Sequence, residues 1–165
     1  MGNAMAGHLA EQLDWHWTQQ LRPRLEGLTD DEYFFEPAPG CWTVHRDGGI
    51  DYAYPAPQPA PLTTIAWRMA HVIVGVLAVR THSHFGGPPA DYLTWRYATD
   101  AATALAQLDD AYRGWMSGVR SLTDSDLARA CGPAEGPLRR GVDGDAGPAH
   151  QSRSHPPRSR DRFAA

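Results

Sequence analysis

The chain has 165 residues, 42% of them hydrophobic, and a net charge of −4, which predicts one domain with a substantial core. The charge is uneven, since residues 1–137 carry a net −7 and residues 138–165 a net +3. An acidic body argues against nucleic acid as a partner, because phosphate recognition needs a basic surface.

Neither a membrane segment nor a secretion signal is predicted. The longest apolar run, Ile65–Val79, contains Arg68 and His71 and is shorter than the roughly 20 residues of a spanning helix. No basic stretch followed by an apolar run opens the chain. Two cysteines, Cys41 and Cys131, do not make a disulfide framework. We therefore expect a soluble, cytoplasmic protein that has no membrane partner.

A first long helix is predicted over about Met5–Leu28, with Pro23 as a site where it could kink. Its apolar residues recur at steps of three and four, which predicts one buried stripe. The stripe consists of Leu9, Leu13, Trp17, Leu21, Leu25 and Leu28.

A short helix and a long loop are predicted next. Thr29 can cap the helix, with Glu32 as its partner in a capping box, and Pro37, Pro39 and Gly40 end it. Residues 41–61 have no clear period and are rich in Pro, Gly and Tyr, which predicts a loop. Ordered loops of this length are often functional.

The second long helix is predicted from Thr63 or Thr64 to about His84, with Gly86 in a left-handed terminating conformation. It is apolar on nearly every side, so we expect it to be the most buried element. A third helix is predicted over about Tyr97–Leu122, because apolar residues follow a strict 4-3 spacing typical of a lengthwise-packed bundle helix.

The segment after the third helix repeats the segment after the first. "LTDSDLARACGPAEG" from Leu122 resembles "LTDDEYFFEPAPG" from Leu28 in its Thr cap, acidic start and Pro/Gly exit. A fourth helix is due at this point, yet residues 138–165 are rich in Arg, Gly, Pro and Ser and bury too little apolar surface to order themselves. The sequence therefore predicts an all-α domain over residues 1–137, an up-and-down four-helix bundle whose fourth helix is missing or replaced by a disordered tail, residues 138–165.

His71 is the first candidate for chemistry. It lies mid-helix among apolar residues, where an imidazole needs either a metal or a hydrogen bond to a neighbouring helix, and spacing alone favours the hydrogen bond. His82 and His84 fit a helix C-terminus, where the dipole favours a histidine. His8, His16 and His45 have no spacing typical of a metal site. Tyr52 and Tyr54 could line a pocket.

The order of these features, and above all "WRMAHV" at Trp67–Val72, resembles the DinB/YfiT-like superfamily, in the branch related to mycothiol-dependent maleylpyruvate isomerases. The resemblance covers about residues 5–137. It implies a four-helix bundle with a divalent metal, of the zinc or nickel kind, held by a histidine triad. It also implies thiol-dependent transferase or isomerase chemistry on small molecules. His71 matches the ligand position of the second helix, whereas the other ligands come from a fourth helix that is not recognisable here.

Two origins of the 138–165 tail stay open. In one, it is a fourth-helix coding region read one base out of frame, because back-translation permits a helix with His and Glu on one face. In the other, it is a natural disordered tail of a GC-rich gene. The gene's nucleotide sequence across codons 135–165 distinguishes them, since a shifted frame without such a helix excludes the first.

Two functions from different classes are therefore expected. The first is a DinB-like metal-dependent protein, with a low-molecular-weight thiol and a small-molecule substrate, that is impaired because His71 alone remains of its ligands. No catalytic acid or base and no thiol-binding residue can be assigned. The alternative is a non-catalytic helical module that forms a homodimer through the groove left by the fourth helix.

Overall fold

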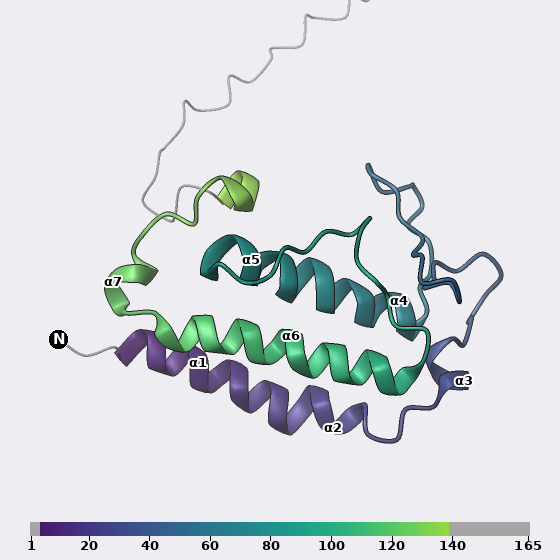
Figure 1. Ribbon diagram of the computed structural model, residues 1–165, viewed down its shortest axis with the longest axis horizontal. Coiled ribbons are helices and arrows are strands. Elements are labelled where there is room, and N and C mark those ends of the chain that lie inside the picture. Colours follow the sequence, from purple (N-terminus) through teal and green to yellow (C-terminus); the bar gives the residue numbers. More distant parts are fainter. Residues whose placement is uncertain (1–3, 139–165) are drawn as a thin grey trace, which may run out of the picture. The chain divides into compact units, whose positions relative to one another are not determined.

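The computed structural model describes residues 4–138, which fall into two units, 4–129 and 130–138. Each unit is described by itself. The described residues form helices and no β-strand, so the prediction of an all-α fold is confirmed. Three long helical segments make the first unit, and short helices α3 (Asp30–Tyr33) and α7 (Asp124–Leu127) follow the first and the third of them (Figure 1).

The first long segment joins α1 (Ala4–His16), a π-helical turn (Trp17–Leu21) and α2 (Arg22–Arg24) without a break in helical dihedral angles. It ends four residues before the predicted Leu28. The wide turn ends two residues before Pro23, whose ring would otherwise crowd the carbonyl four residues earlier. Trp17 is buried as predicted, but Leu9 is 45% exposed, and Ala6 and Ala10 face inward instead.

The second long segment begins and ends within a residue of the prediction. Thr64 caps α4 (Ile65–Ala70), a π-helical stretch (His71–Ala78) follows, and α5 (Val79–Phe85) ends at Gly86 with a φ of 68°. The segment is not buried all round, because one side carries exposed residues such as His71 and Val76. Its inward residues are Ala66, Met69, Ala70, Ile73, Val74 and Leu77.

The third long helix, α6 (Ala101–Ser121), is the central one and lies between α1–α2 and α4–α5 (Figure 1). It starts after the predicted Tyr97 because Asp100 is its cap and accepts the backbone N–H of Thr103 at 2.7 Å. Its buried residues are Ala101, Ala104, Leu108, Tyr112, Met116 and Gly118.

The helix directions do not alternate strictly along the chain. α1–α2 runs antiparallel to α6, since Arg22 bonds Asp109 near one end and Asp14 bonds Arg120 towards the other. By contrast, α4–α5 runs parallel to α6, and its final Phe85 packs on Trp115 with ring centroids 5.2 Å apart. The second and third segments run in the same direction because the connection between them, residues 86–100, runs back along the bundle before α6 begins. We call this connection the crossover.

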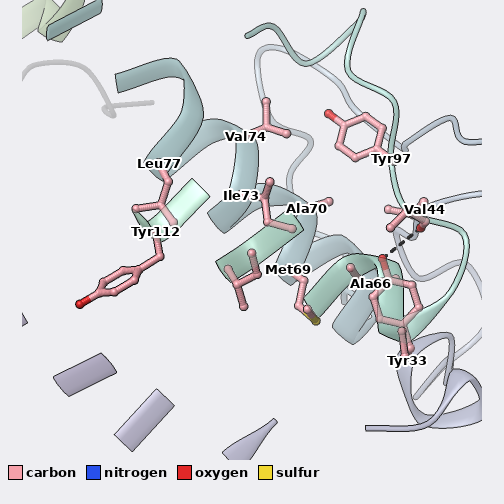
Figure 2. Packing of buried hydrophobic residues seen from close by; sticks show 14 of the residues in the cluster. Tyr33, Val44, Ala66, Met69, Ala70, Ile73, Val74, Leu77, Tyr97 and Tyr112 are labelled. Atoms are coloured by element: carbon pink, nitrogen blue, oxygen red, sulfur yellow. Dashed lines mark hydrogen bonds between the residues drawn. The ribbon is translucent and has the colours of Figure 1, made fainter. Parts of the chain in front are cut away.

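The core collects side chains from all three segments and from the connections. Figure 2 shows Met69, Ile73 and Leu77 of the second segment in this cluster with Tyr112 of α6. Tyr33 of α3 is 1% exposed, and its hydroxyl donates to the Ala98 carbonyl at 3.1 Å. The crossover is therefore tied to the short helix that follows α2.

In the second unit, residues 133–138 form a 3₁₀ helix. The sequence predicts that the 138–165 tail is disordered or comes from a shifted reading frame. Residues 139–165 of this tail lie outside the described part of the chain. The predicted domain boundary at residue 137 likewise stays a prediction.

Candidate functional site

His71 lies on the exposed side of the second helical segment, at the start of the π-helical stretch. Wide helical turns of this kind are frequent at functional sites. The imidazole stacks on Trp67, with ring centroids 5.3 Å apart and planes within 6°. Its Nδ1 lies 2.5 Å from the hydroxyl of Tyr92. His71 thus has the hydrogen-bond partner expected of it, supplied by the crossover rather than by a neighbouring helix.

The long loop supports this group of rings. The Trp67 indole Nε1 donates to the Asp51 carbonyl at 2.8 Å. Tyr52 stacks on Tyr92, with centroids 5.2 Å apart. Tyr54, which the sequence also suggested as a pocket residue, is 88% exposed. We call His71, Trp67, Tyr92 and Tyr52 the aromatic cluster.

Gly75 explains why Tyr92 can reach His71. It lies four residues after His71, and a Cβ there would collide with the Tyr92 hydroxyl. The neighbouring Arg80 donates from Nη1 to the Gly75 carbonyl at 2.6 Å, which satisfies an acceptor inside the π-helical stretch. Glycine is therefore required here for space, not for an unusual backbone angle.

The protonation states in the cluster follow from its surroundings. Partial burial, and then the positive charge of Arg80, lower the pKa of His71, so the imidazole is neutral at pH 7. Burial, and then Tyr52, raise the pKa of Tyr92, although Arg80 opposes this, so the phenol keeps its proton. A hydrogen bond therefore joins a neutral imidazole and a neutral phenol.

The tautomer of His71 decides which partner donates the hydrogen bond to Tyr92. Within residues 4–138, the Tyr92 hydroxyl has no hydrogen-bond acceptor other than His71 Nδ1. If the phenol proton points to the Nδ1 lone pair, it has an acceptor among these residues, and the imidazole then carries its own hydrogen on Nε2. In this state neither ring nitrogen offers a lone pair to a metal.

Two further histidines of the described chain lie outside the aromatic cluster. His82 Nδ1 lies 2.8 Å from the Gly87 carbonyl, which agrees with the expected role at a helix C-terminus. His45 Nε2 pairs with Asp51 Oδ1 at 2.9 Å. Over residues 4–138, no three His, Cys, Asp or Glu side chains gather closely enough to hold a metal ion. The described donor set thus does not fit the histidine triad that the resemblance implies.

Sequence reasoning missed Tyr92 and Gly75. Tyr92 follows Pro88 and Pro89, in a stretch treated as a simple connection, and no local pattern indicates that it folds back onto a helix 21 residues earlier. Gly75 carried a weak signal, because a glycine inside a helical pattern costs stability and often marks a close approach.

None of the described helices is long and apolar enough to cross a membrane. No curated protein and no solved structure matches the chain. A family comparison, however, matches residues 12–143 to the DinB superfamily. The match spans most of the sequence and includes the first long helical segment from residue 12, the other two long segments and the aromatic cluster. The chain therefore belongs to the DinB superfamily.

Proposed function

We propose that this protein is a DinB-superfamily member in which metal-dependent thiol transferase or isomerase activity on a small molecule is impaired. The observation that carries the proposal is the state of His71. Its Nδ1 is hydrogen-bonded to Tyr92, and the described residues gather no group of three metal-ligating side chains. Structural and catalytic zinc sites normally use three or four protein ligands.

Binding a metal at His71 would require a rearrangement. For Nε2 to coordinate, its hydrogen must leave and Nδ1 must carry one, and Nδ1 would then donate to the Tyr92 oxygen. The phenol proton would lose the acceptor it now has. A bound divalent metal would supply Lewis-acid chemistry and lower the pKa of a thiol or water. We therefore expect a single imidazole in this hydrogen-bonded state to bind a divalent metal only weakly.

Metal analysis of the purified full-length chain tests the proposal. We expect substoichiometric zinc and nickel after dialysis, and Zn²⁺ titration that gives weak binding and differs little between wild type and His71→Ala. His82→Ala is the matched control, because that histidine bonds to a backbone carbonyl on the same helical segment. A tightly held stoichiometric metal that is lost in His71→Ala would contradict the impairment.

One observation favours the second candidate function, self-association. Leu9 belongs to the predicted inward stripe but is 45% exposed, and Met5, one turn before it, is 58% exposed. An exposed apolar pair on a bundle helix is a starting point for association. Sedimentation at several concentrations should reveal a dimer that Leu9→Glu weakens, whereas a monomer at every concentration would exclude this function.

A further inference from the structure

An apolar pocket lies where α5, α6 and the crossover meet, all within the first unit. Its volume is about 240 Å³. The hollow exists because small residues face each other between the helices, namely Ala78 on one side and Ala111 and Gly114 on the other. For scale, an engineered apolar cavity of about 150 Å³ holds benzene. The pocket can therefore admit a substituted benzene ring.

The polar groups at the pocket are already paired with other parts of the protein. The Thr81 hydroxyl donates to the Leu77 carbonyl at 2.8 Å, and its methyl carbon lies closest to the Gly114 position. The Gln107 amide donates to the Arg96 carbonyl at 3.1 Å. Asp110 forms an ion pair with Arg113. The pocket thus offers apolar surface and no uncompensated charge, which favours an uncharged ligand.

Trp95 is the exception among these groups. Its indole Nε1 is buried, and across the described residues it has no hydrogen-bond partner. Buried donors are almost always satisfied in native proteins, so an unsatisfied one calls for an explanation. Because Trp95 belongs to the pocket wall, a molecule bound there is a candidate partner for Nε1 if the ring turns towards it.

We propose that this pocket binds a small, uncharged molecule with an aromatic or branched aliphatic body and one carbonyl-type oxygen that accepts from Trp95 Nε1. The pocket is distinct from the aromatic cluster, since it shares no residue with that cluster. The proposal needs no metal and no thiol. It therefore stands or falls independently of the proposed function.

Acetophenone is the probe, and ethylbenzene, which lacks the oxygen, is its matched control. The chain has six tryptophans, so an amide NMR spectrum shows their indole N–H signals, and the signal missing in Trp95→Phe belongs to Trp95. We expect acetophenone to shift this signal saturably, and ethylbenzene to cause no hydrogen-bond shift. In Trp95→Phe, acetophenone should bind between about two- and tenfold more weakly, the loss of one net hydrogen bond.

Gly114→Leu fills the pocket and should abolish binding of both probes. Ala106→Leu places the same side chain on an exposed position of α6 and should leave binding unchanged. If Gly114→Leu does not fold, Ala111→Val provides a smaller obstruction, and the Trp95→Phe comparison remains. The proposal is overturned if acetophenone causes no saturable shift, or if the shift survives filling the pocket. Equal acetophenone affinity in wild type and Trp95→Phe would overturn the assigned hydrogen bond.

Discussion

Oδ1 of Asp30 accepts the backbone N–H of Ala101, the first residue of α6, at 2.8 Å. The second copy of the repeated segment makes an equivalent bond, since Asp124 Oδ1 accepts the backbone N–H of Ala6 in α1 at 3.0 Å. In each copy the threonine caps its own short helix, and the next aspartate binds the start of a different, longer helix. The repeat thus joins helices that are far apart in sequence.

Asp30→Ala should destabilise the protein by about 1 kcal/mol, because it leaves an N–H at the start of α6 without its acceptor. Asp31→Ala is the matched control, since Asp31 is adjacent and equally acidic, and makes no such bond among the residues that the structure describes. It should change stability by less than about 0.5 kcal/mol. Urea denaturation measures both. Equal losses would show that the effect comes from acidic charge near the helix start and not from this bond.

The capping boxes could be predicted from sequence because each is local. Thr29 and Glu32 exchange bonds three residues apart, as do Thr123 and Asp126. The second role of the repeat could not be predicted, since it depends on where the distant Ala101 lies in the folded chain. Each copy carries an aspartate directly after its threonine, and only the tertiary structure explains what this aspartate binds.

The limits of the second helical segment were also predictable, because Thr64 and Gly86 have strong terminal preferences. The candidate site was predictable only in part. The motif pointed to His71, but its nearest partner comes from a crossover whose path no periodicity reports. Apolar periodicity placed the third helix, yet not its start, because Asp100 ends the crossover through a side-chain bond.

Two glycine substitutions test the packing of Tyr92. Gly75→Ala should leave the protein less stable than Gly114→Ala by about 1–3 kcal/mol, because the new methyl group collides with the Tyr92 hydroxyl. At Gly114 a Cβ would lie 3.6 Å from the Thr81 methyl, an ordinary contact. Both variants gain the helix propensity of alanine, so the difference isolates the collision. Thermal unfolding provides the comparison, and equal midpoints would contradict it.

Acidification should reveal the cap of α6. The backbone N–H of Thr103, and then its side chain, hold the pKa of Asp100 below its ordinary value. A carboxyl group whose pKa is lower in the folded state stabilises the protein above its unfolded pKa of about 3.9, and this contribution is lost as the pH falls through the folded value.

Asp100→Asn still caps the helix but does not titrate. Wild type should therefore be the more stable protein at pH 7, and the gap should close between about pH 5 and pH 2. Glu32 and Asp126 titrate in both proteins and cancel in the comparison. If the difference in the free energy of unfolding between the two proteins stays constant over this pH range, Asp100 contributes no pH dependence to stability.

The hydrogen bond between Tyr92 and His71 decides whether this imidazole is available to a metal. In wild type at pH 8, the imidazole signals of His71, assigned by their loss in His71→Gln, should show an unprotonated Nδ1 and a protonated Nε2. Tyr92→Phe removes the donor and should move the ring towards an exchanging mixture of the two tautomers. Long-range proton–nitrogen NMR measures the state of each nitrogen.

Tyr52→Phe is the matched control, because it removes a hydroxyl from the ring stacked on Tyr92 and leaves the bond to His71 in place. It should give the wild-type spectrum. A protonated Nδ1 in the wild-type protein would contradict the assigned direction of the bond. Nε2 would then carry a free lone pair, Tyr92 would act as the acceptor that orients a metal-binding histidine, and the case for an impaired site would weaken accordingly.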